Sequence, residues 1–337
     1  MAKQRRSPAP FSERRFHRWL ARTLPSGPGS LLPLGDDAAA LRVPPGAVAV
    51  LSTDSLVEGT HFLPGSRPEL VGRAAVAVNL SDLAAKGATP AGVLLALLLP
   101  PATPADWARR LIRGAAAEAK RVGTTIVGGD TKPSSRRAIV GAVVGWADPR
   151  HLSPRRAARP GDRIFVTGTV GRGGAAFDRL RRRQGTPRPS DLDRLLSVEP
   201  RLAEGRWLAS RAHAMMDTSD GLAESAHLLA EASRVALELD GARIPWDPGL
   251  GRPRPKDPAW LATACFGGDY ELFAAVPRRA GRIPGRIATE IGRVWAGRGV
   301  TIRIEGVPRR LGRGGWQPFA AAGLSAGPRR NARGARP

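Results

Sequence analysis

Five short motifs along the chain place aspartate directly after an apolar or small-residue run, with Gly, Ser, Thr or Asn beside it. Several carboxylates in one cleft repel each other and lose hydration, which is costly unless a cation neutralises them. Magnesium is the expected cation, because it takes hard oxygen ligands and shares its shell with substrate phosphates. The pattern predicts metal-bridged phosphate chemistry. The motifs are Leu34–Asp37, Val48–Asp54, Val76–Asp82, Ile126–Asp130 and Met215–Gly221.

Each motif taken alone also has a second interpretation, because Asp before Gly, Ser or Thr is common in turns and helix caps. Asp217-Thr218-Ser219-Asp220-Gly221 ahead of Leu222 is itself a good N-cap pattern. The glycine-rich segment 168–174 matches neither the G-x-G-x-x-G nor the Walker A spacing. Five motifs that each follow an apolar run favour the metal interpretation, with a buried strand expected to deliver each carboxylate to one edge.

The elements that must position these carboxylates alternate between strand-like apolar runs and Ala-rich helical segments, the order expected of an α/β or α+β fold. A Pro- and Arg-rich segment at 149–160 separates two such regions. We predict a basic N-terminal extension at 1–30 containing a helical candidate, ordered structure from about Leu31, domains at 31–148 and 149–323, and a disordered basic tail at 324–337. Strands are expected at 48–51, 93–99, 124–127, 139–144, 163–166, 235–239 and 272–276, and helices at 11–24, 70–77, 107–121, 175–183, 200–210 and 221–231.

Composition narrows the class of protein. The 337 residues carry a net charge of +24 with 5% aromatic residues, so a base-stacking platform for nucleic acid is not expected, although nucleic-acid binding stays an alternative function. The single cysteine, Cys265, excludes an internal disulfide and multi-thiol metal sites. No apolar run approaches the ~20 residues of a membrane span, and the basic N-terminus lacks a signal-peptide core. A cytoplasmic protein without membrane contact is expected.

Taken together and in order, the motifs closely resemble those of the thiamine-monophosphate kinases, within the aminoimidazole-ribonucleotide synthetase-like superfamily. The resemblance covers about residues 31–320. It implies a two-domain fold in which N-terminal domains pair into a dimeric β-barrel-like core beside an α+β C-terminal domain. The strings that carry it are GDDAA (35–39), STDSLVEGTHF (52–62), AVNLSDLAA (77–85), GGDT (128–131), DTSDGL (217–222) and DYEL (269–272).

The resemblance also implies an activity and a set of site residues. The activity is ATP-dependent phosphorylation of thiamine monophosphate to thiamine diphosphate, with Mg²⁺ as cofactor and a homodimer as the assembly. Catalysis would depend on Asp54, Asp130 and Asp220. ATP contacts would be Gly129, Arg155 and Ser219, and substrate contacts His61 and Trp316. Metal ligands would be Asp37, Ser52, Thr53, Asp54, Asp82, Asp130, Asp217 and Asp220.

Three positions depart from the family pattern. Gly268 stands where a glutamate expected to contact the substrate is usual, Lys86 replaces a methionine, and Lys132 replaces a threonine. The metal set is therefore kept while part of the substrate set is altered. Alternatives are another ATP-dependent enzyme of the superfamily with a different acceptor, or a basic nucleic-acid-binding protein on a kinase-like fold.

Overall fold

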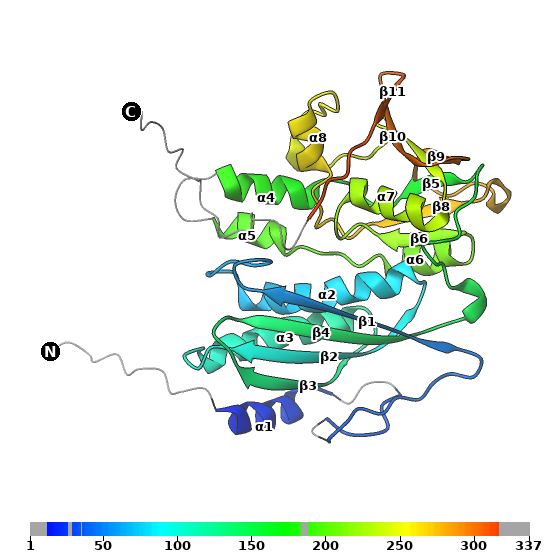
Figure 1. Cartoon of the computed structure of the whole chain (residues 1–337). Coiled ribbons are helices and arrows are strands. Elements are labelled where there is room, and N and C mark those ends of the chain that lie inside the picture. Colours follow the sequence, from blue (N-terminus) through cyan, green and yellow to red (C-terminus); the bar gives the residue numbers. More distant parts are fainter. Residues whose placement is uncertain (1–11, 26–28, 35, 183–187, 317–337) are drawn as a thin grey trace, which may run out of the picture.

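The computed structural model describes residues 12–25, 29–34, 36–182 and 188–316. Two sheets, one from each half of the described chain, are stacked with helices between and beside them (Figure 1). The predicted α/β class and the two-domain architecture are confirmed. The predicted tail at 324–337 lies outside the described residues. Within the described chain, no helix is both long and apolar enough to cross a membrane.

The N-terminal sheet has four strands in the order β1-β4-β2-β3, so β1 and β3 form its two edges. Its buried face packs on α2 and α3, and buried side chains alternate with partly exposed ones along β4 as expected for a sheet covered on one face. The elements are β1 (Val48–Val57), β2 (Thr89–Leu99), β3 (Ile126–Pro133), β4 (Ala138–Ala147), α2 (Pro68–Ala85) and α3 (Ala105–Arg121).

Helix α2 is buried on almost every side, which agrees with its nearly continuous run of Ala, Val and Leu. Two glycines allow α2 and α3 to approach closely. A Cβ at Gly72 would lie 1.9 Å from the carbonyl oxygen of Leu111, and one at Gly114 would lie 2.0 Å from that of Glu69. Any larger side chain at either position would force the helices apart.

The C-terminal sheet has seven strands in the order β11-β10-β7-β9-β5-β8-β6. Strand β6, at one edge, carries Asp217 at its end, and its N-terminal neighbour α6 packs on α2. Helix α7 follows directly and lies on this sheet (Figure 1). The elements are β5 (Arg163–Val166), α4 (Arg172–Arg182), α5 (Pro189–Leu195), α6 (Leu202–Ala209), β6 (Ala214–Asp217), α7 (Leu222–Ser233), β7 (Ala236–Asp240), α8 (Pro258–Ala264), β8 (Leu272–Val276), β9 (Thr289–Trp295), β10 (Gly299–Ile304) and β11 (Val307–Arg310).

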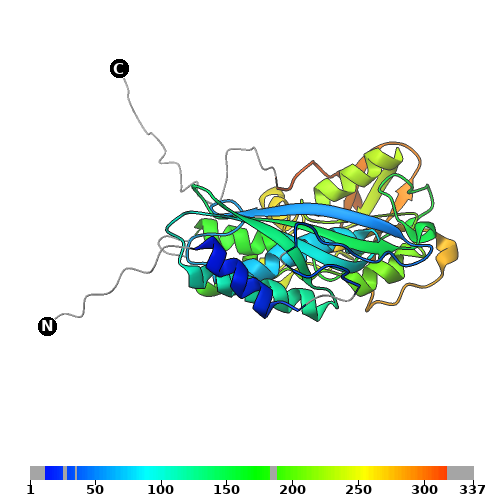
Figure 2. The ribbon, with the colours of Figure 1, turned by 90° about the horizontal axis from the view of Figure 1, so that it is seen from below.

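Two expectations about local structure are wrong. Ordered structure was expected from about Leu31, but the helix expected at 11–24 is present as α1 (Glu13–Thr23) and packs on the core through Phe16, beside β3 in Figure 1 and toward the viewer in Figure 2. Each carboxylate was also expected to follow a strand. Asp54 and Asp130 instead lie within β1 and β3, whose polar residues continue the hydrogen-bonded ladders, and Asp82 lies within α2, whose apolar run is helical.

Candidate active site

Four of the predicted metal ligands come together where α2 meets the C-terminal domain. Asp54 comes from β1, Asp82 from α2, Asp217 from the end of β6, and Asp220 from the loop before α7. Burial raises the pKa of Asp54 to about 7, and the charges of Asp82, Asp217 and Asp220 add to the effect. Burial and the charge of Asp82 raise the pKa of Asp217 to about 6. These shifts indicate a carboxylate cluster with unfavourable mutual repulsion.

Neighbouring polar side chains fix the positions of the cluster. The Ser52 hydroxyl donates to Asp82, and the Ser81 hydroxyl donates to Oδ2 of buried Asp217 at 2.7 Å. The buried Asn79 side chain accepts the backbone N–H of Asp54 at 2.9 Å through its Oδ1. Asn79 and Ser81 are absent from the predicted site residues, although both stand in the NLSD string next to Asp82, whose helical conformation brings them to the cluster.

The alternative interpretation of the 217–221 motif as a helix cap is not supported by the structure. The N-cap residue of α7 is Gly221, which has φ of 98°, and no side chain makes a capping hydrogen bond there. The Asp220 carboxylate is therefore left available to the cluster, and burial raises its pKa.

Two cations lie beside the cluster. Lys86, which follows α2, donates from Nζ to the carbonyl oxygens of Met215 at 3.0 Å and Ser153 at 3.2 Å. Burial and the charge of Arg155 lower the pKa of Lys86 to about 8, against the opposing effect of Asp217 and Asp82. The amine therefore stays mainly protonated at neutral pH. The charge of Arg155, a predicted ATP contact, opposes the rise in the pKa values of Asp217 and Asp220 without reversing it.

The oxygen atoms of the cluster are suitable ligands for Mg²⁺ ions that also bind substrate phosphates. Carboxylate and hydroxyl oxygens are the hard ligands that Mg²⁺ prefers, and Mg²⁺ usually completes its shell with water and substrate oxygens. Among the described residues, no three carboxyl, thiol or imidazole groups already converge as a closed metal cage. Asp54, Asp82, Asp217 and Asp220 would hold such ions from one side, leaving the other side for a polyanion.

A cavity of about 420 Å³ between the two domains joins the cluster to an aromatic region. Asp54, Ser219 and Asp220 line one part of it, and the predicted substrate contacts His61 and Trp316 line another. His61 Nδ1 accepts the backbone N–H of Val57 at 3.1 Å, so the neutral imidazole carries its proton on Nε2. Burial lowers the pKa of His61, which favours this neutral form.

Two phenylalanines that sequence reasoning did not select extend this aromatic region. Phe266 stacks on Phe177 with ring centroids 4.4 Å apart and lies edge-on to Trp316 at 5.8 Å. The Trp316 ring lies 6.0 Å from that of His61. The sequence feature that comes closest to indicating these rings is Phe266, which stands two residues before Gly268, the position that departs from the family pattern. The cavity thus offers carboxylates in one part and flat apolar rings in another.

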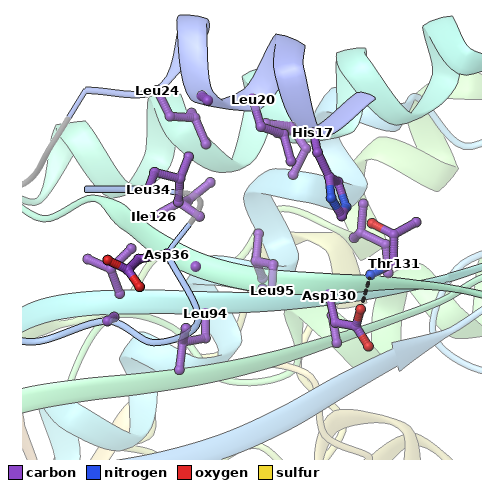
Figure 3. A pocket seen from close by; sticks show the side chains of 18 of the residues that line it. His17, Leu20, Leu24, Leu34, Asp36, Leu94, Leu95, Ile126, Asp130 and Thr131 are labelled. Atoms are coloured by element: carbon purple, nitrogen blue, oxygen red, sulfur yellow. Dashed lines mark hydrogen bonds between the residues drawn. The ribbon is translucent and has the colours of Figure 1, made fainter. Parts of the chain in front are cut away.

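Three further predicted residues line a second cavity of about 490 Å³ on the N-terminal domain. Asp37, Gly129 and Asp130 line it together with apolar side chains of α1 and β2. Figure 3 shows Asp130 near His17 of α1, with Asp36 elsewhere along the same cavity. Asp130 pairs with Lys132 at 2.9 Å, which lowers the pKa of its carboxyl. The Thr53 hydroxyl donates to the carbonyl oxygen of Gly141.

Asp54 and Asp130 do not meet within one chain. Asp54 is in register with Gly141 on β4, Gly141 with Leu95 on β2, and Leu95 with Gly129 on β3. Three strand spacings separate the two edges, roughly 14 Å. Leu95 is buried on the helix-covered face, and strand alternation directs Asp130 to the opposite face.

Without metal, the protein should lose stability as pH rises from about 5 to about 7.5. The folded-state pKa values of Asp54 and Asp217 lie above their ordinary values, so the folded protein binds more protons than the unfolded chain and is favoured at low pH. We expect the free energy of unfolding to fall by ~1–3 kcal/mol over this range, and millimolar Mg²⁺ to remove most of the loss. Thermal unfolding in EDTA and in MgCl₂ tests this; a melting temperature that rises with pH in EDTA would contradict it.

The comparisons with known proteins agree with this geometry. Residues 35–147 match the model of the AIR synthase related protein N-terminal domain, and residues 159–305 match that of its C-terminal domain. The two sheets and the cavity between them thus define a member of the AIR synthase-related class of two-domain proteins.

Relatives within this class narrow the assignment. The thiamine-monophosphate kinase of Caulobacter vibrioides is 35% identical over 312 residues, which cover 87% of this chain and 88% of that protein. The Halobacterium salinarum thiamine-monophosphate kinase is 39% identical, with 78% and 88% covered. The structure of AaThiL complexed with AMPPCP and TMP superposes with a TM-score of 0.71 at 32% identity, covering 84% of this chain and 90% of that one. The chain belongs to the thiamine-monophosphate kinase family.

Proposed function

We propose that the protein transfers the γ-phosphate of ATP to thiamine monophosphate and releases thiamine diphosphate. The observation that carries this proposal is the interdomain cavity, where Asp54 and Asp220 lie in the same space as His61, Trp316 and Phe266. A metal-binding carboxylate cluster suits the reacting phosphates, and flat rings suit a heteroaromatic acceptor. The names of the relatives and the ligands of the AaThiL complex support the same reaction.

The residues of this chain have separable tasks in that reaction. The acceptor phosphate needs no strong general base, because the second pKa of a phosphate monoester is ~6 and its oxygen is already ionised. Asp54, Asp82, Asp217 and Asp220 would hold Mg²⁺, which neutralises and orients phosphate oxygens when bound.

The other predicted contacts would position the two substrates. Arg155 and Ser219 would hold ATP phosphates, and the Nε2–H of His61 can donate to the acceptor. Trp316 would support the acceptor ring. Catalysis then consists mainly of holding two polyanions in line, which direct phosphoryl transfer requires.

Asp130 would contribute to the active site of a second copy of the chain. We infer a homodimer in which the open faces of two N-terminal sheets enclose a shared core. That face carries the large apolar side chains Leu51 and Leu94, which are 72% and 41% exposed, and Val144 and Ala142 are their register partners on β4. Burying such a face is favourable at about 25 cal/mol per Å².

The same assembly explains the separation of the predicted metal ligands. β1 and β3 are the two edges of the sheet, so a barrel closed by two sheets places β1 of one subunit beside β3 of the other. The partner's β3, which carries Gly129 and Asp130, would then be the strand next to Asp54. Asp54 faces α2 and Asp130 faces the enclosed side, so the two carboxylates would act on one site only through a metal–phosphate group that passes the edge of β1. The cavity of Figure 3 would lie at the subunit boundary.

A direct assay tests the proposed reaction. Purified protein is incubated with Mg-ATP and thiamine monophosphate, and thiamine diphosphate is measured by chromatography. A panel of other phosphate and carboxamide acceptors separates this activity from that of other superfamily enzymes, and a salt-dependent DNA gel shift tests the nucleic-acid alternative. Faster turnover of another acceptor, or tight DNA binding without turnover, would contradict the proposal.

Gly268 provides a prediction about acceptor affinity. It lines the cavity, and a Cβ there would meet nothing closer than 3.5 Å, so a side chain has room. Restoring the family glutamate by Gly268→Glu should lower KM for thiamine monophosphate roughly tenfold, because a hydrogen bond to a charged group is worth ~1.5–3 kcal/mol. Gly268 has φ of 78°, a conformation that strains any residue with a side chain. This strain offsets part of the gain in binding free energy.

The control for this prediction is Gly268→Ala, which has the same backbone cost without a carboxylate and should not lower KM. KM for ATP should change little in both variants. A Gly268→Glu enzyme that binds thiamine monophosphate more weakly than the parent would show that Phe266 and its neighbours have rebuilt this loop for a different contact.

A further inference from the structure

Lys86 lies beside the carboxylate cluster. It places a positive charge near carboxylates that a metal ion would otherwise neutralise. It follows the last residue of α2, four positions after Asp82, and its Nζ donates to the carbonyl oxygen of Met215, two residues before Asp217. A second hydrogen bond to the carbonyl oxygen of Ser153 fixes the ammonium group from the linker side. Within the part of the chain that the structure describes, backbone carbonyls and not a carboxylate accept the hydrogen bonds of this cation.

The charges around this ammonium group favour a counter-ion role. Asp217 is 3% exposed and accepts from the hydroxyls of Ser81 at 2.7 Å and Ser219 at 3.4 Å. Two neutral donors leave its negative charge poorly compensated. Asp82 and Asp217 both interact electrostatically with Lys86, and Arg155 is the cation that opposes it. A buried carboxylate needs such compensation from a cation or from several donors.

We propose that Lys86 is a built-in cation of the metal site, which neutralises the Asp217 side of the cluster and weakens binding of Mg²⁺ before the nucleotide arrives. The inference rests on the proposed metal-binding role of the cluster. A fixed positive charge repels a divalent ion and offsets one carboxylate, so free Mg²⁺ binds this chain more weakly than it binds a cluster with a neutral side chain at position 86. Mg²⁺ then enters mainly as the ATP complex, whose phosphates supply the missing negative charge.

The test is calorimetric titration of nucleotide-free protein with MgCl₂, with Mn²⁺ paramagnetic resonance to count bound ions. Lys86→Met and Lys86→Gln should each tighten binding about tenfold or add one ion. Lys86→Gln keeps amide donors for the two carbonyls, so it remains informative if Lys86→Met fails to fold. Lys86→Arg keeps the charge and Lys120→Met removes an exposed lysine elsewhere, so both should bind Mg²⁺ as the parent does.

The outcomes separate the inference from the proposed function. If Lys86→Met and Lys86→Gln unfold at lower temperature but bind Mg²⁺ with parental affinity, Lys86 only links the two domains and the proposal is overturned. Asp54→Asn is titrated in parallel. If Asp54→Asn also binds Mg²⁺ as the parent does, the cluster is not a metal site, and both the inference and the proposed function fail together.

Discussion

Asp54→Asn should lower turnover of Mg-ATP and thiamine monophosphate by about a thousandfold. The substitution keeps the shape of the side chain and removes one charge from the centre of the carboxylate cluster, where burial and three neighbouring aspartates already raise the pKa of Asp54 to about 7. Loss of a metal bridge is worth several kcal/mol of transition-state stabilisation, and ~4 kcal/mol corresponds to about a thousandfold in rate.

Stability distinguishes this loss of activity from misfolding. Removing one of several mutually repelling charges should make the metal-free Asp54→Asn protein melt at a higher temperature than the parent near neutral pH. Asp106→Asn, an exposed position in the first turn of α3, is the charge control: activity should not change, and melting should fall slightly because an acid at a helix N-terminus is stabilising. An Asp54→Asn enzyme with near-parental turnover at limiting Mg²⁺ would remove Asp54 from the metal site.

Mixed dimers should recover activity that neither parent variant has. Asp54→Asn and Asp130→Asn homodimers are both expected to be nearly inactive. If Asp130 contributes to the active site that contains the partner's Asp54, a heterodimer of the two variants has one site with both substitutions and one intact site. It should therefore have about half the parental turnover.

The measurement uses co-expressed subunits with two different affinity tags, so that only heterodimers are assayed. Light scattering checks that the parent is a dimer of ~70 kDa, twice the chain mass. Heterodimers as inactive as the two homodimers would place Asp54 and Asp130 in the same subunit's site. An active monomer would exclude the dimer altogether.

The sequence was sufficient to predict most of the central elements, because their apolar runs are long and bounded by Gly, Pro or charge. β5 and β8 have the expected bounds. β1 continues six residues past the expected end, since Ser52 to Val57 keep their ladder with β4 although the first four of them are polar. β9 and β10 were not predicted, because their Arg-containing segments are strands only through pairing with β5 and β7, far away in the chain.

The site residues show a similar division. Motif strings were enough to select Asp54, Asp82, Asp217 and Asp220, which the fold brings together. They could not show the environment of Lys86, because its two carbonyl partners are 67 and 129 residues away in the chain. Nor could they show that Asp130 lies on the other edge and face of the sheet, since strand order is a property of the folded domain.

The position of α2 makes folding of the two domains cooperative. Its side chains belong to one continuous core that includes Leu97 of β2, Leu208 of α6 and Met215 of β6, so residues from both sheets lose water together. Neither half can unfold without exposing an apolar face of α2, which makes a single melting transition the expected behaviour. A chain cleaved in the 149–160 linker would stay assembled until that common transition, and its two halves would depend on each other for solubility.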